Sequence, residues 1–139
     1  MIRVIKFEPE HVLGVNLQPM QAEALPEISL EYGKELAGRG PAVTGLIDGR
    51  VLFCGGKAKL SERRWYCWAL LSKEAGRYMT AVTHIAKRLL ETQRGDGELC
   101  ALVRSDFAQA QRWIQMLGFD RHRSVEIDGL PCDVYIKVH

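Results

Sequence analysis

The sequence predicts a mixed α/β domain, with a sheet of seven strands and helices on both faces of the sheet. Segments typical of strands and of helices follow one another along the whole chain. Residues 65–71 are apolar on both alternating faces, which is typical of a central strand covered by helices on both sides. The 139 residues, 47% hydrophobic and 26% charged, suit one domain over 1–139 with an ordinary core.

The N-terminal part predicts one strand followed by two short helices. Alternating apolar residues indicate a strand over 2–7, and residues 11–24 have helical features. Pro26 suits the first turn of a second helix over 26–37. The run Gly-Arg-Gly-Pro at 38–41 ends this helix, because glycine adopts left-handed conformations and proline then prevents continuation.

The middle of the chain predicts a hairpin and then the central strand. Two β-rich runs, 42–47 and 51–54, flank Asp48-Gly49, a dipeptide that favours a type I′ turn. The polar residues 57–64 are interpreted as a loop before the strand at 65–71.

The clearest helical pattern follows the central strand. Ser72 is a suitable N-cap, and Glu74 falls in the first turn. Apolar residues recur at helical spacing from Val82 to Leu90, and Gly-Asp-Gly at 95–97 ends the helix. A further apolar strand is expected over 99–103.

The last part predicts one more helix and two strands. Ser105 or Asp106 caps a helix that Gly118 closes at the C′ position, with Phe119 packing back onto the helix. Strands over 124–127 and 134–138 are linked by residues 128–131. The expected order is therefore β-α-α-β-β-β-α-β-α-β-β.

Charge and composition exclude several classes of function. Nineteen Lys and Arg against seventeen Asp and Glu leave a net charge of +2, too small to indicate nucleic-acid binding by itself. Basic residues beside tryptophans can bind nucleic acid, but a solvated hairpin loop beside a buried strand is the simpler interpretation. We therefore expect no nucleic-acid partner. The residues concerned are Lys57, Lys59, Arg63, Arg64, Trp65 and Trp68.

Membrane and metal sites are also not expected. No apolar run approaches the ~20 residues of a membrane span, and the first residues alternate as in a strand rather than as in a signal peptide. The cysteines lack the spacing of a zinc site or a disulfide scaffold. We therefore expect them to be small buried hydrophobic residues of a protein in a reducing cytoplasm. The histidines form no cluster, and His84 is expected to be structural. These residues are Cys54, Cys67, Cys100, Cys132, His11, His84, His122 and His139.

One helix carries a resemblance to a known family. Residues 105–119, SDFAQAQRWIQMLGF, resemble the N-x-x-A-x-x-x-Y-x-x-x-G-F helix of the GNAT superfamily of N-acetyltransferases. Together with the element order, the chain resembles this superfamily over nearly its whole length. The resemblance implies that acetyl-CoA lies where two central parallel strands splay apart. It implies further that the pantetheine pairs with a strand edge and that the pyrophosphate lies at the next helix N-terminus.

The resemblance also implies where cofactor contacts lie. The family loop Gln/Arg-x-x-Gly-x-Gly/Ala corresponds here to Lys-Glu-Ala-Gly-Arg-Tyr at 73–78. Tyr78 replaces a small residue that lets phosphate approach the backbone, and Glu74 adds a negative charge. An ordinary capped helix is the alternative interpretation. The implied cofactor-binding residues are Leu70, Leu71, Lys73, Gly76, Arg77, Tyr78 and Ser105.

No catalytic residue emerges from the sequence. The family's frequent general acid, a tyrosine, corresponds here to Ile114, which cannot donate a proton. Ser105 stands near a family asparagine, but a helix cap is the preferred interpretation. Glu62 is the nearest candidate for a general base, and a solvated loop carboxylate is preferred there.

Two functions follow from the resemblance. The first is an acetyl-CoA-dependent N-acetyltransferase of the cytoplasm, acting on an amine of a small molecule or protein. The second is an inactive GNAT-fold protein of a phage or prophage, located in the host cytoplasm or the virion. It would act in virion assembly or protein interaction, with a second copy or a phage structural protein as partner. Segments 52–56, with Trp68, and 112–118 resemble that phage group.

Overall fold

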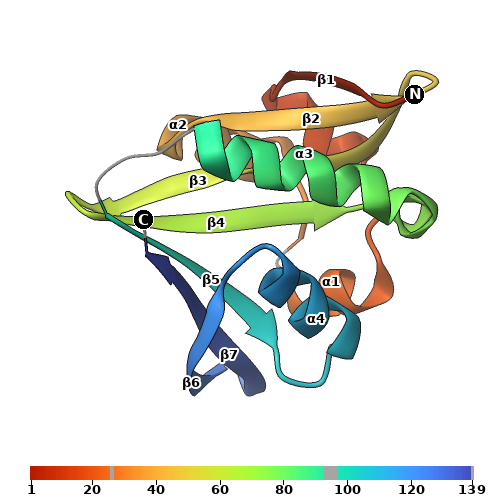
Figure 1. Ribbon diagram of the computed structural model, residues 1–139. Coiled ribbons are helices and arrows are strands. Elements are labelled where there is room, and N and C mark those ends of the chain that lie inside the picture. Colours follow the sequence, from red (N-terminus) through yellow and green to blue (C-terminus); the bar gives the residue numbers. More distant parts are fainter. Residues whose placement is uncertain (26, 93–96, 139) are drawn as a thin grey trace. The chain divides into compact units, whose positions relative to one another are not determined.

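The predicted fold class is confirmed. The computed structural model describes residues 1–25, 27–92 and 97–138. Its strands form a mixed seven-stranded sheet in the order β1-β2-β3-β4-β5-β7-β6 (Figure 1). The chain divides into two compact units: residues 1–59 with 67–81, and residues 60–66 with the described residues from 82 onward. Predictions that fall on Pro26, residues 95–96 and His139 lie outside the described residues.

The first unit contains an antiparallel group of strands. β1 (Arg3–Lys6) pairs with β2 (Ala42–Ile47), and β2 pairs with β3 (Arg50–Ser61), as Figure 1 shows. Asp48 and Gly49 have φ values of 49° and 78° between β2 and β3, which confirms the expected turn conformation.

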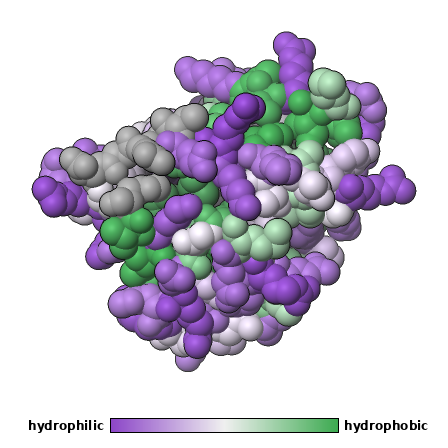
Figure 2. All heavy atoms as spheres, viewed as in Figure 1, coloured by the Kyte–Doolittle hydropathy of each residue, from purple (hydrophilic) through white to green (hydrophobic). Residues whose placement is uncertain are grey.

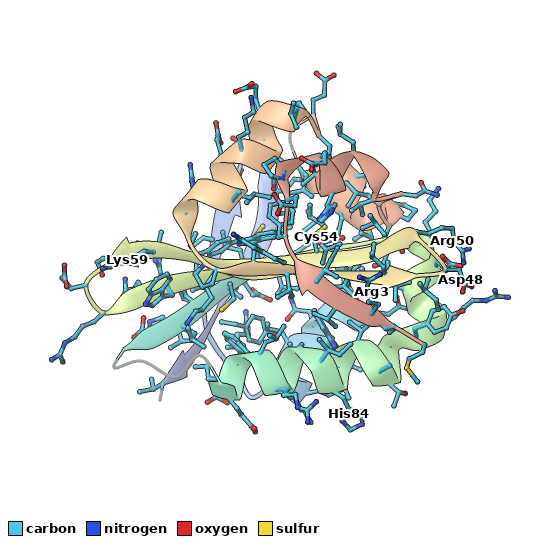
Figure 3. All side chains as sticks on the ribbon, turned by 90° about the horizontal axis from the view of Figure 1, so that it is seen from above. Arg3, Asp48, Arg50, Cys54, Lys59 and His84 are labelled. Carbon is cyan, nitrogen blue, oxygen red and sulfur yellow. The ribbon has the colours of Figure 1, made fainter. Side chains whose placement is uncertain are left out.

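The prediction of a loop over 57–64 is wrong. β3 continues to Ser61, and β4 (Arg64–Leu71) begins after a turn at Glu62 and Arg63. Ala58 is buried between half-buried Lys57 and exposed Lys59, the latter lying toward the end of β3 far from Asp48 (Figure 3). The strand therefore tolerates lysines because its neighbours in the sheet, rather than side-chain polarity, decide the backbone conformation.

The helices of the first unit are shorter than expected. The helical segment predicted over 11–24 is divided into a 3₁₀ helix η1 (Pro9–Gly14) and an α-helix α1 (Pro19–Ala24). Proline is favoured at the start of a helix, so Pro19 opens a new one. α2 (Leu30–Arg39) follows, and residues 27–29 precede it without helical structure. The hydroxyl of Ser29 accepts a hydrogen bond from the Tyr32 amide at 3.2 Å, which explains why α2 begins there.

Side chains from the helices and strands of the first unit form a common core. The Phe7 and Trp68 rings meet edge to face with centroids 5.5 Å apart. Trp68 is thus a half-buried ring packed against the core. Cys54 is fully buried, and burial raises the pKa of its thiol to about 11. The buried members of this core are Phe7, Val12, Leu36, Cys54 and Leu70.

The second unit carries the other end of the sheet. Residues 64–66 of β4 pair in parallel with the first residues of β5 (Glu98–Arg104). β5 pairs antiparallel with β7 (Leu130–Val138), which pairs with β6 (Asp120–Ile127). The last two strands are longer than expected, because the turn between them is only Asp128 and Gly129, with φ values of 50° and 80°.

The predicted C-terminal end of α4 (Ala108–Met116) is confirmed. Gly118 has a φ of 94°, and its amide donates to the Gln115 carbonyl at 2.9 Å. The Phe119 amide donates to the Ile114 carbonyl at 3.2 Å, and the Phe119 ring is buried. This is the Schellman arrangement, in which a left-handed glycine ends the helix.

The predicted N-cap of α4 is wrong. The residue at the N-cap is Phe107, with no side-chain cap hydrogen bond. Asp106 instead forms an ion pair with Arg104 at 2.7 Å. The Asp106 side chain is thus paired with the end of β5 rather than with the first turn of α4.

Hydrophilic side chains cover most of the face visible in Figure 2, with apolar areas between them. No helix among the described residues has the length and apolar character needed to cross a membrane.

Candidate functional site

The candidate site begins where β4 ends. Leu70 and Leu71 are buried, with 2% and 9% of their surface exposed. The prediction that a regular helix begins at Ser72 is wrong. A 3₁₀ helix, η2 (Lys73–Tyr78), follows first, and α3 (Met79–Thr92) begins only after it. Ser72 occupies the N-cap of η2, but its hydroxyl makes no cap bond and is buried without a hydrogen-bond partner among the described residues.

Protein carbonyls already occupy several amides at the start of this turn. The Ser72 amide donates to Leu52 at 3.0 Å, and the Lys73 amide donates to Asn16 at 2.8 Å. The Ala75 amide donates to the Ser72 carbonyl, and its methyl group is fully buried. These contacts anchor η2 to the first unit. These three amides are therefore not available to an anion at η2, which would have to contact other groups of the turn.

Glu74 has a partner that the sequence did not suggest. Arg50, at the start of β3, donates to both oxygens of Glu74, from Nε at 3.2 Å and from Nη2 at 2.8 Å. Figure 3 shows Arg50 beside Asp48 at this end of the hairpin. The hydrogen bond from Arg50 is the main cause that lowers the pKa of Glu74. The negative charge that Glu74 brings to the turn is thus neutralised within the same unit.

We expect Glu74→Gln to reduce the acid sensitivity of the fold. The pKa of Glu74 is depressed in the folded state, so its contribution is present above the ordinary carboxyl pKa and is lost as pH falls through the folded value. Melting temperatures measured from about pH 3 to about pH 7 should decline less steeply on the acid side in this variant than in wild type.

Glu31→Gln is the matched control for this prediction. Glu31 pairs with Lys34 at 3.5 Å, but its side chain is 83% exposed, so the substitution should leave the profile unchanged. Identical acid profiles for wild type and Glu74→Gln would refute a folded-state role of the Arg50–Glu74 pair.

Gly76 leaves open space in the middle of η2. A Cβ atom built on it meets no atom within 4 Å, and its φ lies outside the left-handed region. The fold therefore does not require glycine at this position. Lys73 and Arg77 are exposed on either side of Gly76, and Tyr78 is half-buried at the end of η2. An accessible backbone between two cations is suitable for an anionic ligand.

The backbone edge of β4 at the same end is covered by a side chain. The Gln21 amide nitrogen donates to the Ala69 carbonyl at 2.8 Å, and the Leu71 amide donates to the Gln21 Oε1 at 2.7 Å. The Gln18 backbone amide donates to the Leu71 carbonyl at 3.1 Å. Sequence reasoning missed Gln21, because a glutamine in a short polar helix is normally solvated and no local pattern distinguishes this one.

The predicted site residues fall into both units. Leu70, Leu71 and residues 73–78 are consecutive in the first unit, whereas Ser105 belongs to the second. There Asp133 is buried, and a hydrogen bond from Ser124 at 2.7 Å is the main cause that lowers its pKa, with smaller contributions from Ser105 and Arg121. Ser105 thus contributes to the lowered pKa of this buried carboxylate, and its contact with a cofactor stays a prediction.

The positions considered for catalysis are either buried in a helix or exposed on the surface. Ile114 is buried in α4 with 7% exposure, and Glu62 is exposed in the turn between β3 and β4. His84 is exposed on α3, where Figure 3 labels it. Among the described residues, no group of three or more His, Cys, Asp or Glu side chains is arranged to hold a metal ion.

Solved structures with a similar fold include proteins named as acetyltransferases. Ard1 from Thermoplasma volcanium matches with a TM-score of 0.78 and 14% identity, over 99% of this chain and 97% of that chain. An acetyltransferase of the GNAT family from Bacillus anthracis matches with a TM-score of 0.71 and 11% identity, over 99% and 94%. The ribosomal-protein-S18-alanine N-acetyltransferase from Escherichia coli matches with a TM-score of 0.73 and 15% identity, over 99% and 94%.

The chain therefore has the GNAT acetyltransferase fold over essentially its whole length, which confirms the fold that the resemblance implied. No protein-family model matches the sequence, and no curated protein matches it significantly. The narrower resemblance to phage and prophage members stays a prediction.

Proposed function

We propose that this protein is an N-acetyltransferase that uses acetyl-CoA. Its fold is that of GNAT acetyltransferases over the full chain. The observation that carries the proposal is Gly76, a glycine that the fold does not need, exposed between Lys73 and Arg77. In this proposal the phosphates of acetyl-CoA lie against η2, and its pantetheine arm pairs with the edge of β4 near Leu70 and Leu71.

Each residue of η2 has a role in this proposal. Lys73 and Arg77 offset phosphate charge, and the missing side chain of Gly76 lets a phosphate approach the backbone. Arg50 keeps Glu74 paired, so that the carboxylate does not repel the phosphates. Tyr78, half-buried at the end of the turn, limits the space there.

The cofactor supplies an acetyl thioester that a neutral amine of a small molecule or protein can attack. The amine must lose a proton, and the CoA thiolate must gain one. Ile114, at the position of the family's tyrosine, cannot donate that proton, so solvent takes this role and we expect a slow reaction in the cytoplasm.

Titration calorimetry with acetyl-CoA tests the proposal. Wild type should bind, and ligand at about 100 times Kd should stabilise the fold by about 2.7 kcal/mol. Gly76→Val should leave the unliganded melting temperature unchanged, because the position is open, but should weaken binding by about tenfold or more, equal to about 1.4 kcal/mol.

Gly38→Val is the control, since Gly38 is another exposed glycine with open space around its Cβ position, in α2. It should bind acetyl-CoA as wild type does. Absence of any binding to wild type at millimolar acetyl-CoA would refute the proposal.

The alternative is a protein that keeps the GNAT fold and acts through protein–protein contacts, as proposed for the phage and prophage group. The buried aliphatic side chain of Ile114 favours it, because this position then needs only to pack. The same titration separates the two functions, since this alternative requires no acetyl-CoA binding.

A further inference from the structure

The edge of β4 near its end has a defined orientation. Successive residues of a strand direct their backbone groups to opposite edges. The Ser72 amide donates to Leu52 of β3. Ala69 and Leu71 lie an odd number of residues before Ser72, so their backbone groups face the edge away from β3.

The Gln21 side chain occupies this edge in the manner of a peptide group. A carboxamide carries one carbonyl acceptor and an N–H donor, like a peptide unit. Its Oε1 accepts from the Leu71 amide at 2.7 Å, while its Nε2 donates to the Ala69 carbonyl at 2.8 Å. Both bonds are short and partly buried, so the two backbone groups are satisfied as a neighbouring strand would satisfy them.

We propose that Gln21 is a displaceable cap on the amide-binding edge of β4. The Gln21 carboxamide takes the place of a ligand's secondary amide, and it must turn away before such an amide can pair with Ala69 and Leu71. This inference rests on the proposed function, in which the pantetheine arm of acetyl-CoA supplies that amide.

The local structure allows Gln21 to leave without unfolding the segment. α1 has only six residues, and its side chains from Pro19 to Glu23 are exposed or half-buried. The Gln18 backbone amide keeps its own bond to the Leu71 carbonyl, and Leu17 forms an antiparallel bridge with Ser72. Rotation of one side chain is therefore enough to free the Ala69 carbonyl and the Leu71 amide.

The cap has a measurable cost for binding. When only the open fraction of a protein binds, the apparent Kd is the intrinsic Kd divided by that fraction. Two hydrogen bonds of ordinary net strength make the open form a minor population. Gln21→Ala should therefore bind CoA about tenfold more tightly than wild type.

The experiment compares wild type, Gln21→Ala and Gln18→Ala by calorimetric titration with CoA and with pantetheine, which lacks the phosphates. Gln18→Ala is the matched control, because its side chain makes only a 3.4 Å contact to the Ser72 carbonyl and its backbone bond is kept. Gln21→Ala should bind both ligands more tightly, and Gln18→Ala should match wild type. Hydrogen exchange of the Leu71 amide should be faster in unliganded Gln21→Ala and slow again on CoA binding.

The outcomes are distinct. If wild type binds CoA and Gln21→Ala binds it equally or less tightly, the cap is refuted and the proposed function stands. A gain for CoA without a gain for pantetheine also refutes the cap, because the effect then lies at the phosphates rather than at the edge. If none of the three proteins binds either ligand, the proposed function and the cap fail together. Slower exchange of the Leu71 amide in wild type than in Gln21→Ala would then identify the Gln21 contact as purely structural.

Discussion

Tyr135→Ala is expected to lower the free energy of unfolding by about 3–5 kcal/mol. Tyr135 lies on β7, has no exposed surface, and is among the largest fully buried side chains of the described residues. Its hydroxyl donates to Gln111 and accepts from Gln115 at 3.3 Å, both on α4. The substitution removes the ring that packs beneath α4 and leaves a cavity. The total stability of a fold of this kind is about 5–15 kcal/mol. Urea unfolding measures the loss.

Two further variants make this prediction specific. Tyr135→Phe keeps the ring but leaves the Gln111 oxygen without its donor, so a loss of about 1–2 kcal/mol is expected. Val138→Ala, at a 73% exposed position of the same strand, should change stability by less than about 0.5 kcal/mol. A loss for Tyr135→Ala no larger than that for Val138→Ala would contradict the packing described for the second unit.

Gly33→Ala is expected to destabilise the protein by about 2–3 kcal/mol, although alanine is the better helix former. Gly33 is buried in α2, and a Cβ atom built on it lies 2.2 Å from the Pro9 carbonyl oxygen and 2.9 Å from its carbon. These are backbone atoms of η1, so the clash cannot be relieved by rotating a side chain. The helix and η1 must move apart, which opens the core around Val12 and Leu36.

Gly38→Ala in the same helix should stabilise the protein instead. Its Cβ position is open, so the substitution should stabilise the protein by about 0.5–1 kcal/mol through helix propensity alone. Thermal and urea unfolding of the two variants side by side give the comparison. Equal effects of the two substitutions would show that α2 and η1 do not approach as closely as the distance requires.

The elements that sequence reasoning predicted correctly are those decided by neighbouring residues. Asp48 and Gly49 form a turn with positive φ, and Gly118 with Phe119 ends α4 as expected. The central strand over 65–71 is also found, since a run of large apolar residues favours a buried strand. In each case the residues that determine the conformation lie within a few positions of one another.

The errors arise where a residue of another segment decides the conformation. The turn η2 replaces the expected start of a regular helix, and it is anchored by the bond from Lys73 to Asn16 and by the ion pair of Glu74 with Arg50. Ser105 or Asp106 was expected to cap α4, and Asp106 instead forms an ion pair with Arg104 on β5. No local pattern reports such a partner.

The sequence by itself determined the order of the strands and α-helices and the turn at Asp48 and Gly49, because backbone preference and apolar periodicity act over short stretches. The tertiary structure alone decided that Glu74 is neutralised by Arg50 and that Gln21 covers the backbone of Ala69 and Leu71. The physical reason is that hydrogen bonds and ion pairs depend on distances of a few ångströms between atoms whose residues lie 24 to 50 positions apart.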